Sequence, residues 1–208
     1  MTCRIDHLVV TAPDLASGVA HVRRALGVTP QTGGEHVRLG THNCVLRLGD
    51  SLYLEVIAPN PQAPAPGRPR WFELDLLTPE SPPRLATWVA RCNDVRAAAA
   101  AAAEPLGDVE PMSRNDLSWL ITIPADGKLR LGGIAPALIE WRTQPHPASR
   151  MQETGCSLVR VWAFHPDAPR ATRLLQSISF EGPLSVTGAS GQPHLVAHIQ
   201  TPGGLRTI

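Results

Sequence analysis

The fold of this chain is indicated by one stretch of sequence, Gly33-Gly34-Glu35-His36-Val37-Arg38-Leu39-Gly40-Thr41-His42-Asn43, which runs directly into predicted strands at residues 44–48 and 52–58. The second of these strands carries Glu55 within an otherwise apolar run, and a predicted strand at residues 5–11 carries His7 in the same way. Buried polar side chains need partners. We therefore expect His7 and Glu55 either to pair with each other or to share a metal ion.

The composition of the 208 residues is typical of a globular protein with a proper core, because 43% are hydrophobic and 18% are charged. The net charge of +1 gives no electrostatic footprint for nucleic acid or for an anionic lipid surface. No apolar run approaches the length that spans a bilayer, and the first strand begins without a signal peptide before it. We expect a cytoplasmic location, with no nucleic-acid or membrane partner.

The four cysteines are scattered along the chain and show no CxxC spacing. A scattered pattern in a cytoplasmic protein predicts neither a zinc site nor a disulfide framework. We therefore expect Cys3, Cys44, Cys92 and Cys156 to be reduced thiols.

An order of strand, helix and further strands recurs three times along the chain. The predicted helices lie at residues 15–26, around the alanine run at 97–103, and at 171–178. Each is preceded by an aspartate suited to cap its first turn, namely Asp14, Asp94 and Asp167. The recurrence divides the chain into units at residues 1–69, which ends in a proline-dense connector, 70–150 and 151–208.

Alignment of the three caps pairs equivalent positions in the units. Counting back equally from each cap aligns His7 with Thr87 and then with Arg160. The strand context of Glu55, Tyr53-Leu54-Glu55-Val56-Ile57, also parallels that of Glu140, Leu138-Ile139-Glu140-Trp141. We therefore expect Glu140 to be the counterpart of Glu55 in the second unit.

A set of short motifs appears in a fixed order along the first sixty or so residues: Ile5-Asp6-His7-Leu8-Val9-Val10 with Pro13-Asp14-Leu15, then Gly33-Gly34 with His36, then Gly40-Thr41-His42-Asn43, then Tyr53-Leu54-Glu55. On these residues the chain resembles the glyoxalase-like branch of the vicinal oxygen chelate superfamily, whose modules are βαβββ. Over residues 85–142 the resemblance is one of architecture only.

The resemblance implies an α+β fold in which two βαβββ modules form a curled mixed sheet around a cleft. A C-terminal βαββ extension would then complete a third half-module, cover an exposed sheet edge, or mediate dimerisation. Members with paired modules in one chain include monomers and dimers, so a homodimer is one expected state.

The resemblance also implies metal ligands at the ends of the first and last strands of each module. Carried over by position, His7, Glu55 and Glu140 would hold a divalent ion of Mg, Mn, Fe, Ni or Zn. The fourth ligand position, usually histidine, falls on Thr87, whose hydroxyl is a poor ligand. For this reason we do not expect the glyoxalase I reaction itself.

Other roles for the same residues stay open. Glu55 and Glu140 are candidate catalytic carboxylates, with His7 and Glu55 acting as base and orienting partner. Alternatively, His7 and Glu55 form a hydrogen-bonded pair that fixes strand register, and Glu140 pairs with Arg142.

A further set of residues is expected to line the cleft and contact a small-molecule ligand: His36, Asn43, Trp119 and Trp141. The two tryptophans lie in predicted strands of the second unit, where they would form an aromatic wall or simply pack in the core. The glycine-rich stretch does not match a phosphate-binding loop, because it precedes a strand rather than a helix.

Two functions fit this pattern. In the first, the protein is a lyase-type or isomerase-type enzyme that acts on a small oxygenated metabolite with the help of a divalent metal. In the second, it is a metal-free protein that sequesters an apolar or aromatic small molecule between its strands. Fold alone does not separate the two.

Overall fold

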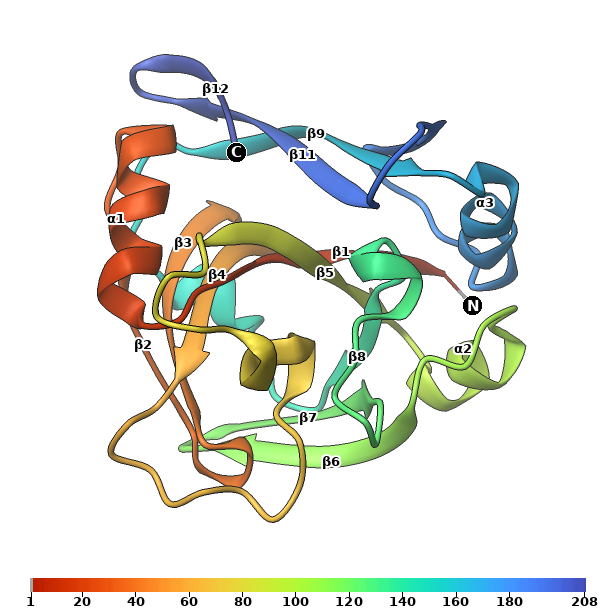
Figure 1. Ribbon diagram of the computed structural model, residues 1–208, viewed down its shortest axis with the longest axis horizontal. Helices are drawn as coiled ribbons and strands as arrows, with labels where there is room; N and C mark the ends of the chain where they lie inside the picture. Colours follow the sequence, from red (N-terminus) through yellow and green to blue (C-terminus); the bar gives the residue numbers. More distant parts are fainter. Residues whose placement is uncertain (1) are drawn as a thin grey trace.

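The computed structural model describes residues 2–208, and its elements follow the threefold order of the sequence (Figure 1). The first module contains β1 (Cys3–Thr11), α1 (Leu15–Leu26), β2 (Gln31–His36), β3 (Thr41–Gly49) and β4 (Leu52–Pro59). The second contains β5 (Arg84–Cys92), α2 (Val95–Ala101), β6 (Asp108–Arg114), β7 (Leu117–Ile123) and β8 (Ala137–Trp141). The C-terminal segment contains β9 (Ser157–His165), α3 (Ala168–Ser177), β10 (Leu184–Gly188), β11 (His194–Thr201) and β12 (Gly204–Thr207).

Both modules contribute to one curled sheet of eight strands in the order β2-β3-β4-β1-β5-β8-β7-β6. Within each module the first and last strands pair in parallel, β1 with β4 and β5 with β8. The modules join where β1 and β5 pair antiparallel, with Leu8 opposite Trp88. Leu8 and Trp88 have the same separation along the chain as the caps Asp14 and Asp94. The join therefore has approximate twofold symmetry, and the predicted α+β fold with a curled mixed sheet is confirmed.

The three predicted helix caps are confirmed by their hydrogen bonds. The backbone N–H of Ser17 donates to Asp14 at 2.8 Å, that of Ala97 to Asp94 at 2.9 Å, and that of Arg170 to Asp167 at 3.0 Å. Each bond satisfies one of the amide groups that a helix leaves unpaired at its start. An aspartate at an equivalent point in each unit therefore begins each helix.

The two faces of the large sheet pack against different partners. Leu8, Trp88 and Ala90 face outward and pack in one core with residues of the C-terminal sheet, including Val161 and Leu195. The alternate residues of the same strands, such as Val9 and Val89, face the interior of the curl and pack in a second core. This alternation follows from the two-residue period of a strand. The interior core is the one that surrounds the candidate site.

The C-terminal segment forms a separate sheet in the order β10-β9-β11-β12, which lies across the outer face of the large sheet (Figure 1). Its first strand, β9, pairs in parallel with β10 and antiparallel with β11. In a module the first strand pairs in parallel with the last, so this segment is not a third half-module. Its sheet packs on the face of the large sheet, and the backbone N–H of Gln152, before β9, donates to Gln31 of the edge strand β2. The division of the chain at residues 69 and 150 into folding units stays a prediction.

Two strands were missed by the sequence analysis, β6 and β12. β6 is an edge strand that contains Pro111, and proline within a run argues against a strand except at an edge. β12 has only four residues and begins at Gly204, a residue type that is depleted in strands. The three helices are close to their predicted positions, and β1, β3 and β4 are close to the strands predicted at residues 5–11, 44–48 and 52–58.

The expectation that all four cysteines are reduced is wrong, because Cys3 and Cys92 form a disulfide. They lie opposite each other in the β1–β5 pairing, while Cys44 and Cys156 are free thiols. Disulfides are rare in reducing compartments, and the cytoplasmic location stays a prediction. None of the helices in residues 2–208 is long and apolar enough to cross a membrane.

The disulfide closes a long loop, since its cysteines are 89 residues apart. Replacement of both by serine, Cys3→Ser with Cys92→Ser, should lower the free energy of unfolding by about 2–4 kcal/mol under non-reducing conditions. Denaturant titration measures this loss, with Cys44→Ser as a control. A reductant should bring the wild type down to the double variant and leave the variant unchanged. Equal stabilities without reductant would contradict the prediction.

Candidate functional site

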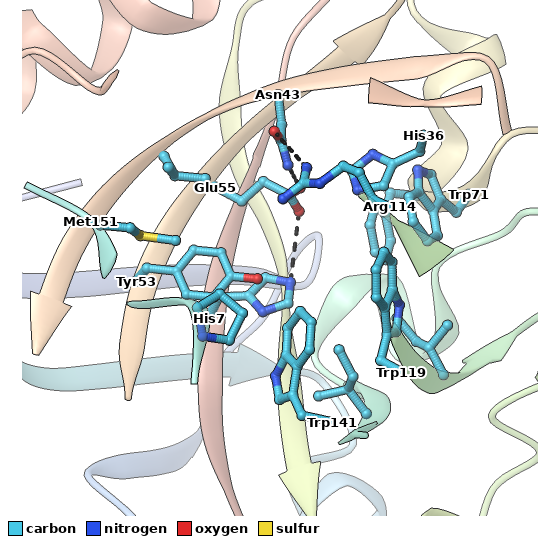
Figure 2. A pocket seen from close by; sticks show the side chains of 15 residues that line it. His7, His36, Asn43, Tyr53, Glu55, Trp71, Arg114, Trp119, Trp141 and Met151 are labelled. Atoms are coloured by element: carbon cyan, nitrogen blue, oxygen red, sulfur yellow. Dashed lines mark hydrogen bonds and ion pairs between the residues drawn. The ribbon is translucent and has the colours of Figure 1, made fainter. Parts of the chain in front are cut away.

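The interior of the curled sheet contains a small cavity of about 30 Å³ (Figure 2). Its walls are mostly aromatic and apolar, with a few polar groups that converge on the interior. The labelled side chains are His7, His36, Asn43, Tyr53, Glu55, Trp71, Arg114, Trp119, Trp141 and Met151. A cavity of this volume holds about one or two water molecules. The site is therefore a narrow pocket around a few polar atoms.

A β-bulge in β1 sets the geometry of the polar groups. Ile5 pairs with Ala90 and His7 with Val89, so two steps along β1 correspond to one step along β5 and Asp6 is the extra residue. Neighbouring residues of a regular strand point to opposite faces, but a bulge redirects a side chain. As a result Asp6 and His7 are in contact, with His7 Nδ1 2.7 Å from Asp6 Oδ1.

Asp6 is fully buried and accepts hydrogen bonds from three segments of the chain. Besides His7 Nδ1, the indole N–H of Trp141 donates to Oδ2 at 3.0 Å, and His146 Nε2 donates to the same oxygen at 3.0 Å. The backbone N–H of Ala148 donates to His146 Nδ1, so the proton of His146 is on Nε2. Burial alone would raise the pKa of Asp6, but the hydrogen bonds and charges of His146 and His7 hold it well below its usual range.

His7 is held in one orientation between Asp6 and Glu55. Its Nδ1–H donates to Asp6, its ring stacks on Tyr53 with centroids 4.5 Å apart, and its Nε2 is 3.6 Å from Glu55 Oε2 (Figure 2). Because Nδ1 carries a proton, a neutral His7 would direct the lone pair of Nε2 at a carboxylate. The pair is attractive only with a further proton on His7 or Glu55, or with a bridging group between them.

Asn43 fixes the carboxylate of Glu55. Asn43 Oδ1 accepts the backbone N–H of Gly34 at 2.7 Å and an N–H of Arg114 at 3.3 Å, which directs its Nδ2 toward Glu55. Nδ2 donates to Glu55 Oε1 at 2.5 Å. The other carboxylate oxygen, Oε2, is the one nearest His7. Glu55 therefore has one oxygen anchored by Asn43 and one that faces His7.

Two more polar groups of the cavity are kept uncharged by their surroundings. Burial, together with the nearby carboxylates of Asp6 and Glu55, raises the pKa of Tyr53 well above its usual range, so its hydroxyl keeps its proton. Burial lowers the pKa of His36 to about 4, so its imidazole is neutral. Tyr53 can therefore donate a hydrogen bond to a ligand without supplying a charge.

The structure brings six of the expected site residues to this one cavity: His7, His36, Asn43, Glu55, Trp119 and Trp141. Trp119 and Trp141 are neighbours on β7 and β8, with ring centroids 5.3 Å apart, and form one wall. Trp119 is also packed in the interior core. Trp119 therefore has both of the roles expected for it, since it packs in the core and also forms part of the cavity wall.

Glu140 does not belong to this site, and the expectation that it is the counterpart of Glu55 is wrong. The strand register aligns Glu55 with Val9 in the first module and Ala137 with Val89 in the second, so Ala137 is the structural counterpart. Glu140 does not line the cavity, to which its neighbours in β8, Ile139 and Trp141, contribute. Its carboxylate accepts the backbone N–H of Val95 at 2.9 Å and pairs with Arg142 at 2.9 Å.

The residues present do not fit the divalent metal site that the resemblance implies. His7 Nε2 and Glu55 Oε2 are two suitable donors, but sites for zinc and non-haem iron use three or four protein ligands. At the equivalent positions of the second module, Thr87 and Ala137 line a separate cavity of about 20 Å³. Within residues 2–208 no group of three or more His, Cys, Asp or Glu side chains is placed to hold a metal ion.

Several residues of the site were not singled out from the sequence: Asp6, Tyr53, Arg114 and His146. Asp6 and Tyr53 lie inside the motifs that were recognised, but strand alternation would direct Asp6 away from His7. Arg114 lies on β6, the strand that was missed, and His146 lies in an irregular segment. Only the tertiary structure brings Arg114 and His146 to the site.

The neutral state of His36 predicts a pH dependence of stability. In the unfolded chain a histidine takes up its proton near pH 6.5, whereas folded His36 does so near pH 4. The unfolded state therefore binds more protons between these values, and the free energy of unfolding falls as the pH is lowered through this window, by up to about 3 kcal/mol. His36→Phe should lose less stability across the window in denaturant titrations. An unchanged slope in the variant would contradict the prediction.

The donor set also predicts a metal content. Wild type purified without added metal should contain well below one divalent ion per chain, and a chelator should leave its melting temperature unchanged, because two protein ligands do not complete a site. Elemental analysis of the wild type and of Glu55→Ala measures this. One bound ion per chain in the wild type, lost in Glu55→Ala, would contradict the prediction.

Comparison with known proteins gives a family match and several similar folds. A family model described as a glyoxalase-like domain matches residues 5–179, and a search of curated proteins found no match. A hypothetical protein from Staphylococcus aureus shares 12% identity, with 100% of this chain and 98% of that chain covered and a TM-score of 0.66. At this identity the likeness shows a shared fold.

Two enzyme structures are less similar. A variant of methylmalonyl-CoA epimerase from Streptomyces coelicolor, in complex with 2-nitronate-propionyl-CoA, shares 20% identity over 67% of this chain and 98% of that chain, with a TM-score of 0.44. A variant of 4-hydroxymandelate synthase from the same organism shares 15% identity over 98% of this chain and 61% of that chain, with a TM-score of 0.45.

Proposed function

Because the chain belongs to the glyoxalase-like domain family of the vicinal oxygen chelate superfamily, we propose that it is a small-molecule enzyme of the lyase or isomerase type. Its substrate is an oxygenated metabolite, and its chemistry is proton transfer by His7 and Glu55. The observation that carries the proposal is the pair His7 Nε2 and Glu55 Oε2, 3.6 Å apart, which lies in a narrow, mostly aromatic cavity.

The pair has the parts that general acid–base catalysis needs. Glu55 supplies a carboxylate oxygen that removes a proton from a carbon next to a carbonyl group, while Asn43 holds its other oxygen. His7 supplies the acid that protonates the substrate, and Asp6 stabilises the imidazolium form and fixes the tautomer. A positioned acid or base of this kind contributes about 10²- to 10⁴-fold in rate.

The negative charge that develops on the substrate oxygen needs hydrogen-bond donors. The hydroxyl of Tyr53 is such a donor, since its raised pKa keeps it protonated. A donor that is fixed before the reaction stabilises an enolate without reorganisation, which is worth several kcal/mol in a dry site. This route needs only groups that the chain itself supplies.

A second candidate function is sequestration of an apolar or aromatic molecule without reaction. One observation favours it specifically. The indole N–H of Trp71 is buried against the cavity and has no hydrogen-bond partner in the part of the chain that the structure describes. This group and the walls formed by Trp119 and Trp141 suit recognition of a flat ligand with one acceptor.

A proton-exchange experiment separates the two functions. NMR in deuterated water follows the C–H bonds next to the carbonyl in a panel of small 2-oxo and 2-hydroxycarbonyl compounds. We expect the wild type to catalyse exchange in at least one of them and Glu55→Gln to lower the rate by about 10²-fold or more.

Glu140→Gln is the matched control, because it makes the same change on a strand of the same sheet outside the cavity. It should keep the exchange rate within about threefold of wild type and lose only the modest stability of a helix-capping bond. The absence of exchange across the panel, or exchange that survives in Glu55→Gln, would refute the enzyme proposal. Binding of a panel compound without exchange would favour sequestration.

A further inference from the structure

Arg114 lies at the junction of two hollows in the structure. It lines the buried cavity with His7 and Glu55, and it also lines an open groove of about 780 Å³. The groove lies between residues 34–38 and 111–115, which belong to the two edges of the curled sheet or follow them directly. His36 is shared by both hollows in the same way. A ligand that enters the buried cavity from this side passes Arg114.

The guanidinium of Arg114 is unpaired. Across residues 2–208 no carboxylate oxygen lies within 4 Å of it, and one N–H donates to Asn43 at 3.3 Å. The neighbouring arginines differ, since Arg38 and Arg68 both pair with Glu110. An arginine has five N–H donors in a planar fork, so most of those of Arg114 are available to a ligand.

The backbone at Gly34 is shaped to hold this guanidinium close. A Cβ at residue 34 would come within 2.9 Å of Arg114 Cδ and within 3.0 Å of one of its terminal nitrogens. A side chain at residue 34 would therefore displace the end of Arg114 from its present position beside the chain. Gly34 also donates its backbone N–H to Asn43, so one glycine supports both the arginine and the carboxylate-anchoring amide.

The volumes of the two hollows indicate which part of a ligand each of them can hold. The buried cavity of about 30 Å³ holds only a small reacting group, whereas ligand sites for metabolites usually measure about 300–1,000 Å³. The groove, at about 780 Å³, is within that range. A substrate therefore has its reacting carbon inside and the rest of its body in the groove, with Arg114 at the point where the two meet.

We propose that Arg114 is the anchor for a carboxylate group, and that the substrate of the proposed enzyme is a small organic acid. This inference rests on the proposed function for the reaction but adds the class of substrate. The planar fork of a guanidinium fits the two oxygens of a carboxylate. Asn43 lies between Arg114 and Glu55, so an anion on the groove side of Arg114 is kept apart from the negative charge of Glu55.

The test compares two probes that differ in charge and share their shape, 3-phenylpropanoate and 3-phenylpropanamide. Isothermal titration calorimetry at low salt measures both with the wild type, Arg114→Gln, Arg114→Lys and Arg142→Gln. We expect the wild type to bind the acid about 10- to 100-fold more tightly than the amide, the range of a charge-assisted hydrogen bond. Arg114→Gln should bind the two probes equally, and Arg114→Lys should keep part of the preference.

Arg142→Gln is the matched control, because it removes the same charge from a residue paired with Glu140 outside both hollows. It should keep the full preference for the acid. Equal binding of the two probes by the wild type, no binding of the acid at millimolar concentration, or a preference that survives in Arg114→Gln would overturn the proposal.

Failure of this proposal and failure of the enzyme proposal can be told apart. Equal binding of the acid and the amide would refute the carboxylate site at Arg114 but would not contradict the proposed proton transfer. Exchange that persists in Glu55→Gln refutes the reaction and leaves the binding preference untouched. If Arg114→Gln does not fold, as judged by circular dichroism, the wild-type probe pair and Arg114→Lys still decide the question.

Discussion

The buried carboxylate of Asp6 is the constraint on which the site depends. A charge with no exposure to solvent is stable only when donors surround it, and here they come from β1, β8 and the segment around His146. These donors tie the first module to the second and to the chain that follows it. The same bonds direct His7 Nε2 toward Glu55. The need to compensate the charge of Asp6 therefore holds the two modules together at the cavity and orients the imidazole of His7.

The two modules share a backbone plan but not a site. The β1–β5 pairing has a register shift at Asp6 and a second one between Val9 and Val10, where Ala86 is the extra residue of β5. The positions of Asp6, His7 and Glu55 in the first module are taken in the second by Ala86, Thr87 and Ala137. Asp6, His7 and Glu55 therefore have polar counterparts at no more than one position of the second module, Thr87, and the charged groups lie on one side of the approximate twofold axis. This asymmetry is also why a complete set of metal donors is missing.

The remaining parts of the molecule support this arrangement from outside. The C-terminal sheet packs across β1 and β5, and the Cys3–Cys92 disulfide links the same two strands. The strands that carry His7 and Thr87 are therefore joined by the ladder, by a disulfide and by the packing of a second sheet. The opposite end of the curl, between the edges β2 and β6, is where Arg114 and the open groove lie.

The sequence by itself determined the three helix caps and the place of His7 and Glu55 within apolar strands, because these depend on local periodicity and on residues close in the chain. That these two strands pair was an expectation from the family resemblance, since the two residues are far apart in the chain. The sequence did not determine that Glu140 faces away from the cavity, that Cys3 meets Cys92, or that Asp6, Arg114 and His146 join the site. Those facts depend on strand register, on one bulge and on an edge strand with a proline. A shift of a single residue in register moves a side chain to the other face of a sheet, so only the tertiary structure decided them.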